Sequence, residues 1–335
     1  MINVFPANRQ SIREVVFRIK TEADFVKVCL DVFRYQVSEN PVYAEWTKAL
    51  GIDISSVKTI AEIPFLPVSF FKTHVLKSGI NPPEIIFTSS GTTGMVTSSH
   101  AVADLKLYQE SYLKGFELFY GKPLDYVIIG LLPAYLERPG SSLVNMAEGL
   151  SRKSGNPQNG FFLYEHSKLK DLLGKLAKQN QKTWLIGVSF ALLDFAELHP
   201  PAWENLTVVE TGGMKGRRKE MIREDLHETI RSSWNVTHLH SEYGMTELLS
   251  QAYLRDNGRF ETPPWMKIMI RETSDPLTYA GFGKTGGVNV IDLANLDSCA
   301  FIATQDLGRQ AGDGSFEILG RFDNSDVRGC NLLVE

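Results

Sequence analysis

The segment Ser89-Ser90-Gly91-Thr92-Thr93-Gly94 contains the residue types that bind phosphate groups. Its two glycines let the backbone turn tightly and present N–H groups to an anion. Its four hydroxyl groups can donate hydrogen bonds to phosphate oxygens. No GK[ST] sequence is present, so the segment is not a Walker A loop. Taken alone, its composition indicates a phosphate loop and a turn that binds nothing about equally.

A second segment with usable chemistry is 241–247, which reads SEYGMTE. Glu247 offers a hard carboxylate oxygen to Mg²⁺. Thr246 offers a hydroxyl group to a phosphate, and Tyr243 offers a flat ring to a base. Taken alone, the segment more simply indicates the start of a capped helix with a glutamate in its first turn.

Two positions nearer the C-terminus have side chains that can hold a ribose. Asp306, in TQDLG, is expected at the end of a strand, where a carboxylate accepts both ribose hydroxyls in dinucleotide sites. Arg321, in GRFD, can donate hydrogen bonds to ribose or phosphate oxygens. The alternatives are a turn at Asp306 and a surface ion pair of small energetic value at Arg321.

His238 and His240 alternate along a segment that resembles a strand and could ligate a metal. Two histidines without further ligands are more often structural. We therefore expect a structural role for both.

The composition is that of an ordinary globular protein, with 43% hydrophobic and 22% charged residues among 335. The net charge of −4 gives no electrostatic reason to expect nucleic acid or an anionic membrane as a partner. Three cysteines do not make a disulfide framework, and reduced thiols fit a cytoplasmic protein. The N-terminal sequence has no signal-peptide core, and no apolar run reaches the length of a membrane span, about 18 residues.

These residues need a scaffold, and the pattern of apolar residues predicts an α/β protein with a sheet covered by helices on both faces. Helices are expected over 9–50 and 102–120, and strands over 84–88, 125–132, 184–190 and 206–209. After position 250 the pattern changes to short strands and turns, which predicts a small β-rich subdomain. The predicted divisions are a helical part (1–80), an α/β nucleotide-binding core (81–250), the β-rich subdomain (251–320) and a short tail (321–335).

The four motifs, in this order and spacing, resemble the adenylate-forming superfamily of acyl-CoA synthetases, luciferases and peptide-synthetase adenylation domains. The segment 89–94 is similar to the phosphate loop of that family, and 242–247 to its aromatic-Gly-x-Thr-Glu motif. Asp306 stands at the ribose-binding position and 320–323 at the hinge motif. Gly212 and Gly213 stand where the family lines its adenine pocket. The resemblance spans roughly 84–335, and implies the N-terminal-domain fold of that family, with the C-terminal domain largely absent.

Within that superfamily, the segments 131–143 and 327–333 are similar to the bioluminescence-type acyl-protein synthetases (LuxE-like). In those proteins a cysteine near the C-terminus accepts the acyl group from the adenylate and passes it to an acyl reductase. Cys330 matches that position, and a thiolate is a good nucleophile for this transfer. A free cysteine without this role is the equally favoured alternative.

The resemblance implies an enzyme that uses ATP and Mg²⁺ to convert a carboxylic acid, of fatty-acid type, to an acyl-adenylate. Thr246, Glu247 and Cys330 would be catalytic, and Glu247 would also hold Mg²⁺. The nucleotide would lie against Ser89 to Gly94, Gly212, Gly213, Tyr243, Gly244, Asp306 and Arg321. The thiol acceptor would be Cys330, coenzyme A or a carrier protein; a non-catalytic nucleotide-binding domain is the alternative from another class.

Two departures from the family pattern leave a positive charge unassigned. Many members have a lysine shortly after the phosphate loop. Here the corresponding segment, Met95 to Ser98, contains neither Lys nor Arg. The C-terminal domain, which supplies a further lysine in full-length relatives, is also largely absent. Lys215 or Arg217 could provide a replacement from another loop.

Overall fold

The computed structural model describes residues 8–89, 96–132, 140–213, 218 and 221–322. The helices are α1 (Arg9–Val15), α2 (Glu22–Glu39), α3 (Pro41–Ala49), α4 (Phe70–Thr73), α5 (Leu105–Tyr120), α6 (Ser142–Ser154), α7 (His166–Lys178), α8 (Ser189–Ala196) and α9 (Arg223–Trp234). The strands are β1 (Leu66–Pro67), β2 (Ile85–Thr88), β3 (Ser99–Val102), β4 (Val127–Leu131), β5 (Gly160–Phe162), β6 (Thr183–Val188), β7 (Leu206–Thr211), β8 (His238–Tyr243), β9 (Ala252–Leu254), β10 (Phe260–Glu261), β11 (Met266–Arg271), β12 (Thr285–Asp292), β13 (Phe301–Gln310) and β14 (Phe316–Arg321). Short 3₁₀ turns occupy Val16–Arg18, Ile60–Glu62 and Pro123–Asp125.

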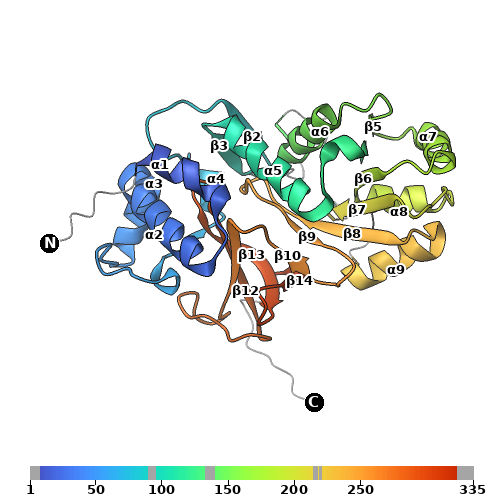
Figure 1. Cartoon of the computed structure of the whole chain (residues 1–335). Helices are drawn as coiled ribbons and strands as arrows, with labels where there is room; N and C mark the ends of the chain where they lie inside the picture. Colours follow the sequence, from blue (N-terminus) through green and yellow to red (C-terminus); the bar gives the residue numbers. More distant parts are fainter. Residues whose placement is uncertain (1–7, 90–95, 133–139, 214–217, 219–220, 323–335) are drawn as a thin grey trace, which may run out of the picture.

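One 12-stranded sheet organises the molecule, in the order β11-β12-β13-β14-β10-β9-β8-β7-β6-β4-β5, with β1 beside β13. From β5 to β8 the strands are parallel. Helices α5 and α6 lie on one side of this part and α8 and α9 on the other (Figure 1). All residues of β4 and β6 are buried, as expected for parallel strands covered on both faces. The predicted α/β fold is confirmed.

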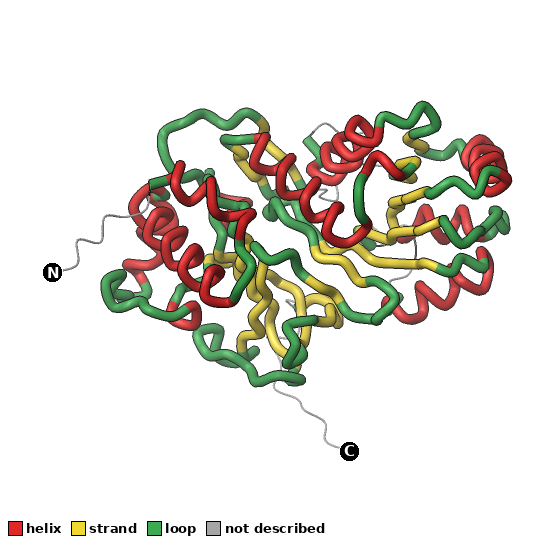
Figure 2. The backbone as a smooth tube through the Cα atoms, in the orientation of Figure 1, coloured by secondary structure: helices red, strands yellow, loops and turns green. Residues whose placement is uncertain are grey.

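From β8 onward the same sheet continues in antiparallel pairs through β9, β10, β14, β13, β12 and β11. The predicted β-rich region is thus joined to the parallel part by main-chain hydrogen bonds, as the continuous strands in Figure 2 show. The domain divisions proposed from the sequence stay a prediction. Strands β2 and β3 form a separate antiparallel hairpin.

Helices α1 to α3, which confirm the predicted helical region, pack against the β13 side of the sheet (Figure 1). A capping box begins α2, in which Thr21 and Asp24 each accept the other's backbone N–H. Tyr43 of α3 stacks on Phe301 of β13, with ring centroids 5.9 Å apart, and Phe33 of α2 meets the same ring edge-on. Aromatic contacts therefore fix these helices on the sheet.

The segment 293–300, between β12 and β13, is a buried loop. A buried loop needs partners for its backbone polar groups. Gln36 supplies three: its amide nitrogen donates to the carbonyls of Asn295 and Leu296, each at 2.9 Å, and its oxygen accepts the N–H of Ala300. Asn40 donates to the carbonyl of Ser298 at 3.0 Å. Helix α2 and the start of α3 thus hold this loop in place.

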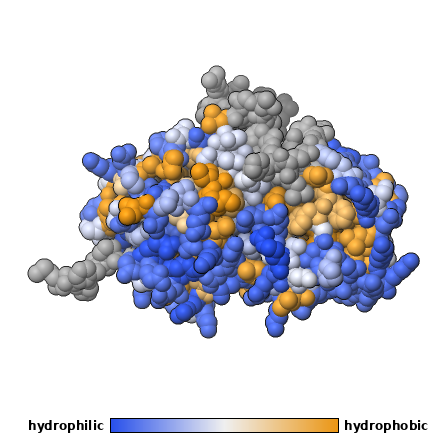
Figure 3. Space-filling view, turned by 90° about the horizontal axis from the view of Figure 1, so that it is seen from above, coloured by the Kyte–Doolittle hydropathy of each residue, from blue (hydrophilic) through white to orange (hydrophobic). Residues whose placement is uncertain are grey.

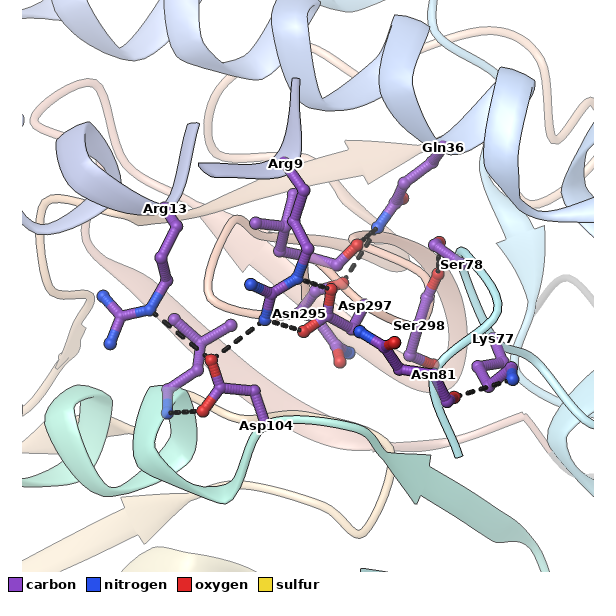
Figure 4. A network of polar contacts seen from close by, with 12 residues as sticks. Arg9, Arg13, Gln36, Lys77, Ser78, Asn81, Asp104, Asn295, Asp297 and Ser298 are labelled. Carbon is purple, nitrogen blue, oxygen red and sulfur yellow. Dashed lines mark hydrogen bonds and ion pairs between the residues drawn. The ribbon is translucent and has the colours of Figure 1, made fainter. Parts of the chain in front are cut away.

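Arg9 ties the first helix to the same loop (Figure 4). Its guanidinium donates two hydrogen bonds to Asp297, at 2.5 and 2.6 Å, and one to Asp104, at 2.9 Å. Asp297 is buried, so Arg9 neutralises a carboxylate that water does not solvate well. The network joins α1, the N-cap of α5 and the 293–300 loop.

Hydrophilic side chains cover most of the face shown in Figure 3, and hydrophobic ones form separate patches on it. Among the helices that the structure describes, none combines the length and the apolar character needed to cross a membrane.

We predict that Arg9→Met lowers the free energy of unfolding by about 2 kcal/mol, because it leaves the buried Asp297 without its charged partner. Arg152→Met is the matched control: Arg152 lies 3.7 Å from Glu148 in an exposed pair, so its loss costs less than about 0.5 kcal/mol. Urea denaturation of both variants measures the difference. Equal effects would contradict the role of Arg9.

Candidate functional site

The carboxyl ends of β6, β7 and β8 bring a ladder of hydroxyl and carboxylate groups together. Ser189, directly after β6, donates to Glu210 Oε1 at 2.5 Å, and Ser241 of β8 donates to Glu210 Oε2 at 3.0 Å. His227 Nε2 lies 3.0 Å from the Ser241 hydroxyl. Ligands of open α/β sheets bind at this end of the strands.

Gly212 and Gly213 follow β7 at this edge. Both have a positive φ, of 88° and 89°, which glycine adopts at little cost. The N–H of Gly213 donates to the Ser189 hydroxyl at 2.9 Å. The two glycines that the sequence analysis assigned to the adenine pocket therefore lie at the strand ends, fixed to the hydroxyl ladder.

Glu242 lies next to this ladder, and its carboxyl group has a raised pKa. Burial raises the pKa of its carboxyl group to about 7; the Thr211 hydroxyl, which donates to Glu242 Oε2, opposes the rise, and the charge of Glu210 adds to it. A Cβ atom at Gly244 would lie 2.3 Å from Glu242 Oε1. Any larger residue at position 244 would therefore require the Glu242 carboxyl group to move.

Tyr243 and Asp306 join the parallel and antiparallel parts of the sheet. The Tyr243 hydroxyl donates to Asp306 Oδ2 at 2.8 Å, although β9, β10 and β14 lie between their strands in the sheet order. Arg321 of β14 is paired with Asp306 in the sheet, and its Nε donates to Asp306 Oδ1 at 3.2 Å. Asp306 is buried, whereas Arg321 has a side chain that is 79% exposed. Three residues that were predicted to bind nucleotide are thus in contact.

The predicted position of Asp306 at a strand end is wrong in detail. Asp306 lies inside β13, next to a register shift between Leu307 and Gly308. Such an irregularity bends a strand and redirects its side chains. The Asp306 carboxylate therefore meets Tyr243 at an irregularity inside the strand and not at the end of the strand.

Thr246 and Glu247 lie in a turn, so the helix start that the sequence alone favoured does not form. Asp292, fully buried, accepts the N–H groups of Leu249 and Ser250 at 2.7 and 2.9 Å. In a helix these two N–H groups would donate to main-chain carbonyls, but here they donate to a carboxylate of β12. The Glu247 carbonyl in turn accepts the side-chain amide of Asn295 at 2.7 Å.

The Glu247 carboxyl group is buried, and this burial raises its pKa. The Ser98 side chain and the positive charges of Arg321 and Lys72 oppose the rise. Lys72, exposed on α4, therefore lies near the predicted metal-binding carboxylate. Sequence reasoning missed Lys72, because it precedes the predicted phosphate loop and belongs to no motif.

The β2–β3 hairpin brings Ser89, the first residue of the predicted phosphate loop, close to Ser98. Ser89 N donates to the carbonyl of Ser98 at 3.1 Å, and Ser98 N donates to the Ser89 hydroxyl at 2.9 Å. His100 of β3 contacts the Thr246 carbonyl through Nδ1 at 2.8 Å. Ser89 is thus held beside Ser98, whose side chain contacts Glu247.

Several predicted residues lie outside the described part of the chain. They are Ser90, Gly91, Thr92, Thr93 and Gly94 of the loop, the cation candidates Lys215 and Arg217, and Cys330. The described Cys29 and Cys299 are buried, and burial raises the pKa of both thiols. Neither thiol is suited to nucleophilic attack.

We predict that Glu242→Gln changes how stability depends on pH. The pKa of Glu242 is about 7 in the folded protein against an ordinary 4.5. At pH values between these two, the native protein holds a proton that the unfolded chain has released. This carboxyl group therefore makes the wild type less stable as the pH rises from about 5 to 7, and glutamine removes that loss. Urea denaturation at several pH values should show the variant gaining on the order of 2 kcal/mol relative to wild type. Glu45→Gln, at an exposed position of α3, is the control, and a pH-independent difference for Glu242→Gln would refute the assignment.

A scan of the sequence against models of known protein families finds no match. A 70-residue segment, 21% of the chain, is 39% identical to the long-chain-fatty-acid–luciferin-component ligase of Photorhabdus luminescens. This match covers 60% of the length of that protein.

Solved structures resemble the chain over much more of its length. One is a 2-hydroxyisobutyryl-CoA ligase, solved with 2-HIB-AMP and CoA in its thioesterification state. The match covers 96% of this chain and 73% of the ligase chain, with a TM-score of 0.67 and 12% sequence identity. ATP-bound MatB from Rhodopseudomonas palustris matches 70% of this chain and 47% of its own, with a TM-score of 0.52 at 16% identity. The chain therefore shares its fold with these solved ligases and with a luciferase-like enzyme from Zophobas morio.

Proposed function

We propose that this chain is an AMP-forming acid–thiol ligase that activates a carboxylic acid of fatty-acid type. The observation that carries the proposal is the convergence of Tyr243, Asp306 and Glu247 with the base of the 89–94 loop, at the carboxyl edge of a parallel sheet. The partial match to a long-chain-fatty-acid ligase supports the class of acid.

In this proposal the nucleoside part of ATP binds along the sheet edge. Asp306 accepts the ribose hydroxyls, and Arg321, whose exposed guanidinium can turn toward the ligand, donates to ribose or phosphate oxygens. Adenine lies near Gly212, Gly213 and the Tyr243 ring. The MatB structure, which contains ATP in the same fold, supports the choice of nucleotide.

Glu247 fits the requirements of a Mg²⁺ ligand. It presents a carboxylate, and among the residues that the structure describes no Lys or Arg lies within ion-pair distance of it. Mg²⁺ bound there through one carboxylate and the phosphates of ATP would neutralise negative charge in the transition state. Lys72 supplies a positive charge nearby and takes the place of the lysine that is missing after the loop.

The first step is attack of a substrate carboxylate oxygen on the α-phosphorus of ATP, with the pyrophosphate oxygen leaving with the bonding electrons. Positioning and neutralisation of charge dominate such a step, because the protein forms no covalent bond in it. The residues of this chain therefore act by holding both reactants in line, with Thr246 donating to a phosphate oxygen.

In the second step a thiolate attacks the acyl carbonyl and AMP leaves. Since Cys29 and Cys299 are buried, an acceptor thiol within this chain has to be Cys330. Coenzyme A or a carrier protein is the alternative acceptor. The 2-hydroxyisobutyryl-CoA ligase structure, which was solved with CoA, supports coenzyme A as that alternative.

We predict that Glu247→Gln lowers ATP–pyrophosphate exchange with a panel of fatty and aromatic acids on the order of 100-fold, because the neutral amide removes a charged metal ligand. Glu45→Gln, which changes an exposed glutamate of α3, should retain full exchange. Exchange by the wild type also identifies the acid. If the wild type binds ATP but exchanges with no acid, the chain is a nucleotide-binding domain and the proposal fails.

We predict that Cys330→Ser leaves pyrophosphate exchange unchanged and abolishes an acyl-enzyme that hydroxylamine cleaves, because a serine ester does not form under the same conditions as a thioester. Mass spectrometry of the intact protein after incubation with ATP and acid measures the adduct. Cys299→Ser is the control and should retain the adduct, since that thiol is buried. An adduct that survives in Cys330→Ser would assign the acceptor elsewhere.

A further inference from the structure

His238, His240 and Asp256 form a cluster at the opposite end of β8 from the nucleotide site. One ligand atom from each of the three lies within 4.8 Å of the others. His238 and His240 lie two residues apart on β8, so their side chains share one face of the strand. Asp256 comes from the turn between β9 and β10. His238 precedes Tyr243 by five positions, about 16 Å along a strand, so this cluster is distinct from the proposed ATP site.

The distances from Asp256 to the two histidines are those of ligands around a metal ion. His240 Nε2 lies 3.3 Å from Asp256 Oδ1, and His238 Nδ1 lies 3.5 Å from Asp256 Oδ2. A charged N–H···O hydrogen bond would be shorter, about 2.7–2.9 Å. Two ligand atoms at about 2.0–2.1 Å from a tetrahedral Zn²⁺ are about 3.4 Å apart. The distances therefore match coordination better than direct ion pairing.

The second nitrogen of each histidine has its own partner outside the cluster. His238 Nε2 lies 3.3 Å from Glu204 Oε1, and His240 Nδ1 lies 3.3 Å from the Tyr120 hydroxyl. The Tyr120 ring also stacks on His240, with centroids 5.8 Å apart. Metal-ligating histidines almost always donate their other N–H to such an oxygen, which fixes the tautomer and the ring orientation. When each histidine donates to its outer partner, its inward-facing nitrogen carries no proton and can ligate.

The charges around the cluster favour a divalent cation. Asp256 and Glu204 supply two carboxylates, with side chains 62% and 75% exposed, whereas His240 is buried. Arg255, the neighbouring cation, is paired with Glu261 at 2.7 Å and lies over the Phe119 ring. The exposed carboxylate of Asp256 lets an ion approach from solvent.

We propose that His238 Nδ1, His240 Nε2 and a carboxylate oxygen of Asp256 bind one Zn²⁺ ion, with water as the fourth ligand. Two imidazoles and one carboxylate are a ligand set typical of zinc. The ion would link β8 to the β9–β10 turn. The structure thus changes the interpretation of His238 and His240, because it supplies the third ligand that the sequence alone did not reveal.

The test is Zn²⁺ titration of the full-length protein after removal of metal, in competition with a chromogenic chelator. We expect one equivalent bound with a Kd below about 10 μM. Asp256→Asn and His238→Gln, both at solvent-accessible positions, should each weaken binding on the order of 100-fold, and Glu204→Gln about 10-fold. Titration with Co²⁺ should give the intense visible absorption of a four-coordinate ion in the wild type and lose it in both ligand variants.

Two controls separate this site from other sources of binding. His199→Asn removes an exposed histidine, and asparagine tolerates its positive φ of 46°, so zinc affinity should not change. Glu247→Gln should also retain zinc, since the proposed Mg²⁺ ligand lies at the other end of β8. Absence of saturable zinc binding in the wild type, or equal affinity in Asp256→Asn and His238→Gln, would overturn the proposal and leave the cluster as a set of ion pairs.

Discussion

The carboxylate of Asp292 is the interaction on which both the fold and the candidate site depend. It is fully buried and accepts hydrogen bonds from the backbone of Leu249 and Ser250 and from the Ser250 hydroxyl, the last at 2.6 Å. The segment that carries Glu247 is thereby tied to β12 and to the buried loop after it. Because α1 to α3 hold that loop through Arg9, Gln36 and Asn40, helices far from the site support its geometry.

Negative charge is the main electrostatic feature of the candidate site. Glu210, Glu242, Glu247 and Asp306 lie at or near one edge of the sheet, and three of them are buried. Hydroxyl donors, the raised pKa of Glu242 and the nearby charges of Lys72 and Arg321 reduce the repulsion among these carboxylates. An excess of carboxylates suits a site that binds a cation between protein and phosphate, whereas it would repel a phosphate that came alone.

The sequence predicted the individual elements well, because their signals are local. The continuous apolar runs of β4 and β6 and the helical periodicity of α5 are examples. It failed where side chains from distant segments decide the local structure. Asp292 prevents the helix expected at Glu247, a register shift places Asp306 inside a strand, and Lys72 reaches the site from α4. None of these contacts leaves a periodic or spaced pattern that a sequence could reveal.

The buried loop 293–300 also constrains the order of events on the ribosome. Helices α1 to α3 are translated first, yet the loop and Phe301 that cover them are made almost 250 residues later. Until then, aromatic faces such as those of Phe33 and Tyr43 lack their native contacts, a state in which nascent chains aggregate readily. The parallel and hairpin regions can assemble meanwhile, so the N-terminal helices are expected to dock last and to need chaperone protection during synthesis.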